Sequence, residues 1–346
     1  MSKRNRDYKV GHETADALIA KLAALSSCKD TERVMREILT TAVKLGRESS
    51  DRGDLKLINN ELKELRYSFK IFAPYRSAKK VVIFGSARSK KTSPEYKMAE
   101  EFAEKITKRN YLVVTGAGSG VMEGGNKGAK KGTDFGLNIR LPYEQMPNPY
   151  IDEKEKIINF KYFFTRKLIF IKETDATALF PGGFGTHDEG FEILTLVQTG
   201  KSKPRPIVML EPTGSRYWAR WKRFLYYEFD KNGFINKEDF NLFKIVRSTD
   251  EAVAYIEDFY RIYHSIRYVD GMTVLRLNKE LSEGTLKRIN AEFKSILTSG
   301  SIKPSAPMPE EREKKEYASL PRIIMKFNHH DYGKLFKLIH VINKEE

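Results

Sequence analysis

The sequence predicts an α/β protein with a Rossmann-like, doubly wound parallel sheet, an N-terminal helical extension and a small C-terminal α/β module. Two observations support this fold class. Short, continuously apolar runs alternate with amphipathic stretches between residues 79 and 264, and glycine-rich segments follow three of those runs. Strands that are apolar at consecutive positions are covered by helices on both faces, as in parallel sheets. Ligands of such sheets bind beyond the carboxyl ends of the strands.

The N-terminal extension, residues 1–75, is expected to contain only helices. Apolar residues recur at helical spacing in three stripes, and Pro74 ends the third. The stripes contain Leu18, Ile19, Leu22 and Leu25; Val34, Ile38, Ala42 and Leu45; and Leu55, Ile58, Leu62, Leu65 and Phe69. Amphipathic helices of this kind usually pack on another domain or a second subunit, which we favour over a membrane-surface role.

The central domain, residues 76–265, is expected to hold the parallel sheet. The predicted strands are 81–84, 112–115, 136–141, 157–160, 176–180, 207–210 and 244–246. The predicted helices are 94–108, 121–131, 165–172, 186–199, 216–230 and 250–264.

The remaining residues, 266–346, predict a small appended module. Strands are expected at 273–277 and 323–327, and helices at 283–297 and 331–342. A segment rich in proline, serine and charged residues, 301–315, is interpreted as a linker.

Charge and composition narrow the classes of partner. The 62 Lys and Arg residues exceed the 46 Asp and Glu residues, which gives a formal net charge of +16 and favours a phosphate-bearing partner. Because acidic residues are interspersed throughout, a solvated basic surface is favoured over a nucleic-acid-binding face. No apolar run approaches the length that spans a membrane, and the single cysteine, Cys28, cannot form an internal disulfide. We therefore expect a cytoplasmic protein that does not enter a membrane.

Two of the glycine-rich loops are, each by itself, only weak evidence for a ligand-binding site. In the first, Gly85 permits close backbone approach, and Ser86 and Arg88 are suited to contact an anionic or ribose group. The second, 116–120, leads into a predicted helix. It lacks the dinucleotide fingerprint because Val121 stands where the third glycine is needed, so an NAD site is not supported.

The third loop, residues 181–189, reads Pro-Gly-Gly-Phe-Gly-Thr-His-Asp-Glu. It follows a predicted buried strand and opens a helix, so backbone N–H groups and the positive helix end form a phosphate cradle. Thr186 and Glu189 also have the spacing of a capping box, which would be purely structural. The three glycines favour the cradle, because a simple helix cap does not require them.

This segment resembles the P-G-G-x-G-T-x-x-E signature of the LOG family, the cytokinin riboside 5′-monophosphate phosphoribohydrolases formerly described as lysine decarboxylases. The resemblance extends over residues 81–200 and includes the first two loops and the pair Arg166-Lys167. It implies that Arg166 and Glu189 are catalytic. It also implies a substrate-binding set of Gly85, Ser86, Arg88, Gly118, Gly120, Glu123, Lys167, Gly182, Gly183, Gly185, Thr186 and Glu192. His187 departs from the family pattern.

The resemblance implies an enzyme that hydrolyses the N-glycosidic bond of a nucleoside 5′-monophosphate, AMP-like or a cytokinin ribotide, to free base and ribose 5-phosphate. Glu189 would stabilise the ribosyl cation or activate water, and Arg166 would supply positioning and electrostatic stabilisation. We expect a homo-oligomer. We expect no metal and no redox cofactor. The alternative is a non-catalytic nucleotide or molybdenum-cofactor carrier of the same fold. The preferred base stays open.

Overall fold

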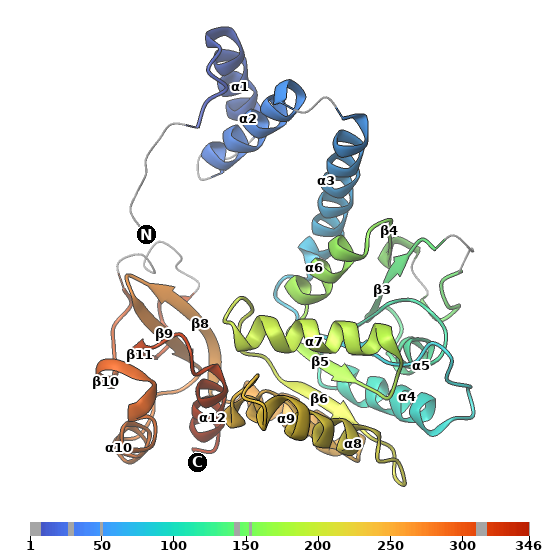
Figure 1. Ribbon diagram of the computed structural model, residues 1–346, viewed down its shortest axis with the longest axis vertical. Helices are drawn as coiled ribbons and strands as arrows, with labels where there is room; N and C mark the ends of the chain where they lie inside the picture. Colours follow the sequence, from blue (N-terminus) through green and yellow to red (C-terminus); the bar gives the residue numbers. More distant parts are fainter. Residues whose placement is uncertain are drawn as a thin grey trace. The chain divides into compact units, whose positions relative to one another are not determined.

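The larger of two sheets in the computed structural model is parallel and has seven strands among the described residues (Figure 1). The structure describes residues 8–26, 31–48, 51–141, 146–151, 154–308 and 317–345, so Cys28 lies outside the described residues. The chain divides into two compact units, Met1–Arg66 and Tyr67–Glu346. No described helix has the length and apolar character needed to cross a membrane.

The first unit is helical, as predicted. Helix α1 (Glu13–Ser26) packs on α2 (Glu32–Glu48), and α3 (Arg52–Phe72) runs across the boundary between the units. Ile19 and Ala23 of α1 are buried, whereas Leu18 and Leu22 of the same predicted stripe are exposed. A short 3₁₀ turn (Ala73–Tyr75) that contains Pro74 follows α3.

The strands of the large sheet end within two residues of their predicted limits. They are β1 (Lys80–Phe84), β2 (Leu112–Thr115), β3 (Asp134–Ile139), β4 (Ile157–Phe160), β5 (Ala176–Leu179), β6 (Ile207–Leu210) and β7 (Lys244–Val246). Their order is β4-β3-β2-β1-β5-β6-β7, with Phe84 of β1 in register with Leu179 of β5. The chain moves outward from β1 to β4 and then returns to the other side of β1. The crevice beside β1 and β5 is therefore the topological switch point, where ligands of this fold class bind.

The helices between these strands follow the prediction to within three residues at each end, apart from two larger corrections. They are α4 (Pro94–Thr107), α5 (Val121–Gly128), α6 (Phe163–Glu173), α7 (Phe184–Gln198), α8 (Tyr217–Phe224) and α9 (Thr249–Phe259), with short 3₁₀ segments at Lys154–Lys156 and Lys237–Leu242. The predicted helix 216–230 changes into a π-helix (Leu225–Asp230) after α8. The predicted helix 250–264 ends at Phe259, because a strand begins at Tyr263.

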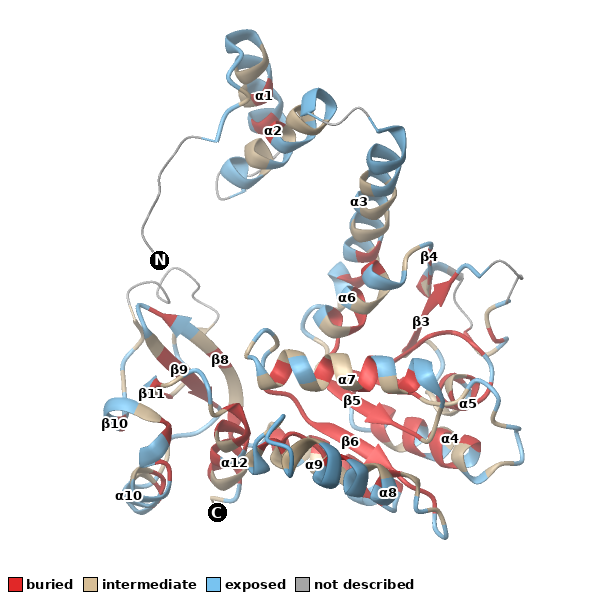
Figure 2. Ribbon diagram, in the orientation of Figure 1, coloured by how far each residue is buried: buried red, intermediate tan, exposed pale blue. Residues whose placement is uncertain are grey.

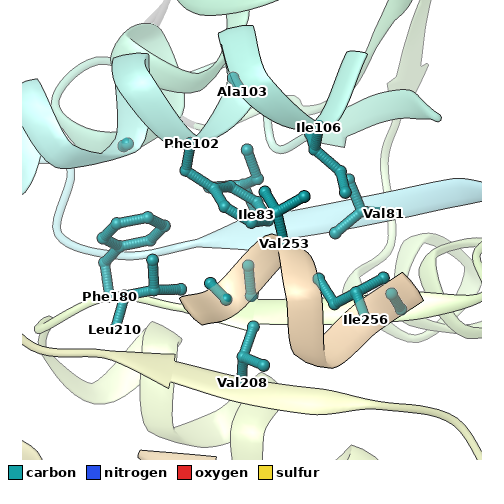
Figure 3. Close-up of a cluster of buried hydrophobic side chains, with 14 of the residues drawn as sticks. Val81, Ile83, Phe102, Ala103, Ile106, Phe180, Val208, Leu210, Val253 and Ile256 are labelled. Carbon is teal, nitrogen blue, oxygen red and sulfur yellow. The ribbon is translucent and has the colours of Figure 1, made fainter. Parts of the chain in front are cut away.

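The core lies on both faces of the sheet. On one face, α4 and α9 pack over alternate residues of β1 and β6, such as Val81, Ile83 and Val208, all fully buried (Figure 3). On the other face, the ring of Phe84 in β1 lies 5.0 Å from that of Phe170 in α6. Burial on both faces explains why the strands are apolar throughout, and Figure 2 shows β5 and β6 almost wholly buried.

The C-terminal module is an antiparallel sheet of order β10-β11-β9-β8, with helices α10 (Glu283–Glu292) and α12 (Tyr332–Asn343). Strands β9 (Met272–Leu277) and β11 (Arg322–Phe327) confirm the prediction, but β8 (Tyr263–Val269) and β10 (Leu297–Pro304) were not predicted. The predicted helix 283–297 ends early because a 3₁₀ turn (Lys294–Ile296) leads into β10. Strand β10 also takes up the start of the predicted linker 301–315, of which residues 309–315 lie outside the described residues.

Candidate active site

A cavity of about 830 Å³ lies at the carboxyl ends of the central strands. The loops after β1, β2 and β5 contribute to its wall, together with the end of β3, α6 and the first turn of α7. Most of the residues predicted from the sequence meet there. Those that line the cavity are Gly85, Ser86, Arg88, Gly118, Arg166, Gly182, Gly183, Gly185, Thr186 and Glu189. Gly120, Glu123, Lys167 and Glu192 lie outside its lining.

The loops after β1 and β5 are joined directly. The Ser86 N–H donates a hydrogen bond of 3.1 Å to the carbonyl oxygen of Pro181. A Cβ atom at Gly182 would lie 2.1 Å from Thr186 Oγ1, a distance that forces a shift. At Gly183 and Gly185 the same atom would meet nothing within 4 Å. Gly182 therefore allows the loop to close on Thr186, whereas the other two glycines keep the approach to the helix end open.

The second loop packs on the first at Gly120. This glycine has a φ of +66°, and a Cβ atom there would lie 2.2 Å from the carbonyl oxygen of Ser86. The same carbonyl accepts a hydrogen bond of 3.0 Å from the Val121 N–H. Gly120 thus shapes the site by close backbone contact.

Glu123, on α5, contacts a lysine and does not line the cavity. Its carboxylate is buried and forms a salt bridge of 2.6 Å with Lys91 Nζ. The structure therefore gives this residue a position behind the second loop, away from the cavity.

Helix α7 begins two residues earlier than predicted, and this removes the capping-box interpretation. Gly183 is the N-cap, and its carbonyl accepts hydrogen bonds from the N–H groups of Thr186 at 3.1 Å and His187 at 3.2 Å. Because the Thr186 N–H is bonded to Gly183, Thr186 is a third-position helical residue and not the cap. Glu189 lies in the second turn, so its carboxylate is not engaged as a cap.

Glu189 is a buried carboxylic acid with a perturbed pKa. Its side chain is only 7% exposed, and burial raises its pKa from 4.5 to about 7. The positive charges of Lys167 and Arg166 oppose that rise. The group therefore titrates near neutral pH, as an acid or base that exchanges protons in a reaction must.

Arg166, on α6, also lines the cavity. Its guanidinium carbon is 5.1 Å from the centre of the Phe163 ring and 5.4 Å from that of Phe170. Its Nε atom is buried without a hydrogen-bond partner among the described residues, and burial lowers the pKa of the group while Glu189 raises it. Within the described residues no salt bridge joins Arg166 to Glu189. The alternative of a closed ion pair is thus not formed, and a donor remains for a ligand.

Lys167 does not line the cavity and reaches α7 instead. Its ammonium group forms salt bridges of 2.8 Å with Asp188 and 2.7 Å with Glu192. Its charge also lowers the pKa of Glu189. The geometry therefore makes Lys167 and Glu192 neighbours that set the electrostatic environment of Glu189, not residues of the cavity wall.

Sequence reasoning missed several residues of the site. Phe163 and Phe184 line the cavity, and Phe184 is 96% exposed, which is unusual for a phenylalanine. Both stand beside residues of the motifs, and that proximity was an available signal. Tyr217 had no such signal: its hydroxyl donates a hydrogen bond to the Gly182 carbonyl across 35 residues of sequence.

A family-model match overlaps the residues of this site. Residues 117–256 match a protein-family model described as "Possible lysine decarboxylase", which spans the second loop, Arg166 and the segment 181–189. Together with the signature in that segment, this match shows that residues 117–256 are similar to the LOG-type proteins. A search of curated proteins finds no match.

Three of the solved structures similar to the chain each match about half of it. The structural genomics target TM1055 is 24% identical, with 52% of this chain and 98% of that chain covered and a TM-score of 0.38. A molybdenum cofactor binding protein from the phototrophic bacterium Rippkaea orientalis is 20% identical, with coverages of 51% and 93% and a TM-score of 0.37. The molybdenum cofactor carrier protein from Chlamydomonas reinhardtii is 20% identical, with coverages of 52% and 96% and a TM-score of 0.36.

Proposed function

We propose that the protein hydrolyses the N-glycosidic bond of a nucleoside 5′-monophosphate to free base and ribose 5-phosphate. One observation carries the proposal. The buried Glu189 carboxyl, whose pKa is raised to about 7, lines the same cavity as Arg166 and the glycine-rich start of α7. An anion site, a fixed cation and a carboxyl group that titrates near neutrality are the parts that this reaction needs.

The 5′-phosphate is assigned to the start of α7. There the helix dipole favours negative charge, and Gly183 and Gly185 leave open space for phosphate oxygens. The Thr186 side chain also lines the cavity at this end. A phosphate held there directs the ribose toward Glu189, one helical turn further along α7.

The chemistry then follows from Glu189 and Arg166. As the C1′–N bond breaks, the ribose develops positive charge, which the ionised Glu189 carboxylate stabilises. A water oxygen bonds to C1′ as the C1′–N bond breaks, one proton of that water passes to Glu189, and the departing base takes up a proton from solvent. Glu189 then releases its proton to solvent, which restores the carboxylate. Arg166 keeps its charge at every relevant pH, so its role is to bind and orient the substrate, not to donate a proton.

The family resemblance supports a homo-oligomer, and the exposed apolar side chains of α6 support it as well. Phe164 and Leu168 are 50% and 48% exposed on that helix. We include self-association in the proposal, to be tested by light scattering. A monomeric mass at every concentration would contradict it.

The function is tested by incubating the purified protein with AMP, GMP, CMP, UMP and a cytokinin ribotide and measuring released base and ribose 5-phosphate by chromatography. We expect the protein to release base and ribose 5-phosphate in equal amounts. We expect the Glu189→Gln variant to release neither. Tight binding of a nucleotide without any release would instead indicate a non-catalytic carrier. That alternative predicts that Glu189→Gln leaves nucleotide affinity unchanged.

A further inference from the structure

A second pocket, of about 750 Å³, lies beside the candidate active site and has not been assigned above. Its wall is formed by the loop before α8 and by the first turn of that helix, including Arg216, Tyr217, Arg220 and Trp221. His187, from α7, lines both this pocket and the first cavity. The two pockets therefore share one side chain but have different walls.

The charge of this pocket is uncompensated. Arg216 and Arg220 are both exposed, and within the described part of the chain neither forms a salt bridge. They stand four residues apart, a spacing at which like charges repel on a helix. They also stand at the start of α8, where the helix dipole disfavours cations. Local stability therefore does not explain two arginines here, whereas an anion between them would relieve both effects.

The same pocket also has aromatic lining residues. Trp221 is half-buried, and its ring centre lies 6.1 Å from that of His187. The rings of His187 and Tyr217 stack at 5.9 Å. Flat rings of a ligand stack on such surfaces, and forked guanidinium groups bind phosphate oxygens in pairs. The pocket thus combines the two features that recognise a phosphate attached to an aromatic base.

We propose that this pocket is a second ligand site, which binds a nucleoside phosphate with its phosphate at Arg216 and Arg220 and its base against Trp221. The site goes beyond the proposed hydrolysis and does not depend on it. We propose binding alone at this site, and among the described residues its lining contains no carboxylate.

The shared wall connects the two sites. The Tyr217 hydroxyl donates to the Gly182 carbonyl at 2.5 Å, so it accepts the 2.6 Å hydrogen bond from His187. His187 must then carry its proton on Nε2. Burial lowers the pKa of His187, which favours the neutral ring. A test of the second site must therefore exclude a signal transmitted from the first cavity.

Intrinsic tryptophan fluorescence can report on ligand binding in this pocket. Both of its tryptophans lie here, because Trp221 lines the pocket and Trp218 packs edge-on against Tyr217 at 4.8 Å. Tryptophan fluorescence is titrated with AMP and with inorganic phosphate in the Glu189→Gln protein, which prevents turnover. We expect a saturable change with AMP and a dissociation constant at least about tenfold larger for phosphate, which lacks the stacking base.

Matched variants assign the signal to the pocket. Arg216→Gln/Arg220→Gln should weaken AMP binding at least about tenfold, because two charge-assisted contacts are lost. Lys222→Gln/Arg223→Gln removes the same charge from the same helix outside the pocket and should leave the dissociation constant unchanged. Thr186→Val, which alters the first cavity, should leave it unchanged as well.

Four results would overturn the proposal. They are the absence of a saturable change with AMP, equal affinities for phosphate and AMP, equal losses in the two double variants, and loss of the signal in Thr186→Val. None of them depends on hydrolysis, so failure of the proposed function is measured separately.

Discussion

Replacing Glu189 by glutamine should stabilise the protein at alkaline pH while it removes activity. The folded state raises the pKa of this carboxyl from 4.5 to about 7, mainly by burial. Below pH 4.5 the group is protonated in both the folded and the unfolded state. As the pH rises to 7, the unfolded state loses the proton first, so the free energy of unfolding falls by about 3 kcal/mol. Glutamine has no such proton to lose.

The measurement is urea-induced unfolding of both proteins at a pH of about 4.5 and again at about 8.5, chosen to bracket the two pKa values. The variant should match the wild type at the lower pH and exceed it by up to about 3 kcal/mol at the higher. Glu192→Gln is the control, because it breaks a 2.7 Å salt bridge with Lys167 and should bring no alkaline gain. An equal stability difference at both pH values would refute the assignment of Glu189 as a desolvated acid.

Three further substitutions test the geometry of the site. Arg166→Gln should lower kcat/KM for AMP at least about 100-fold, and Arg166→Lys should not restore it, because lysine lacks the guanidinium fork; steady-state kinetics that show a near-normal lysine variant would contradict this. Gly182→Ala places a Cβ atom 2.1 Å from Thr186 Oγ1 and should weaken AMP binding about tenfold or more in calorimetry, well beyond the effect of Gly183→Ala, which meets open space. Tyr217→Phe removes the hydrogen bond to the Gly182 carbonyl and should cost about 1 kcal/mol in urea unfolding and weaken AMP binding, so an unchanged affinity would show that this bond does not hold the loop.

Much of the sheet could be predicted because its signal is local. Each strand from β1 to β7 is a short apolar run between helical stretches, and burial on both faces requires that pattern. Strand β8 was missed although Asp270-Gly271, both with positive φ, form the turn into β9. An Asp-Gly pair is a strong hairpin signal and was available in the sequence. Strand β10 gave little signal, because most of its side chains are exposed.

The sequence predicted which loops form the site, but it did not predict which residues of the site form hydrogen bonds with one another. Ser86 and Gly182 follow strands that lie side by side, so the topology of the fold brings them together. The start of α7 was misplaced because Gly183 and Thr186 are both suitable N-caps, and only the hydrogen bonds to the Gly183 carbonyl decide between them. The contact of Tyr217 with Gly182 depends on packing between distant segments, which no local pattern records.

The central claim is that the ionised Glu189 carboxylate drives cleavage of the N-glycosidic bond. Its most direct test is the pH dependence of kcat/KM for AMP, which reports the groups of the free enzyme and substrate. The wild type should gain activity as the pH rises through about 7, the pKa of Glu189.

The Glu189→Gln enzyme should be slower by about 100-fold or more and should lack that rise. The substrate phosphate titrates near pH 6, and its effect persists in the variant's profile, which separates the two groups. A variant that turns over AMP at the wild-type rate, with the same rise through about 7, would contradict the account.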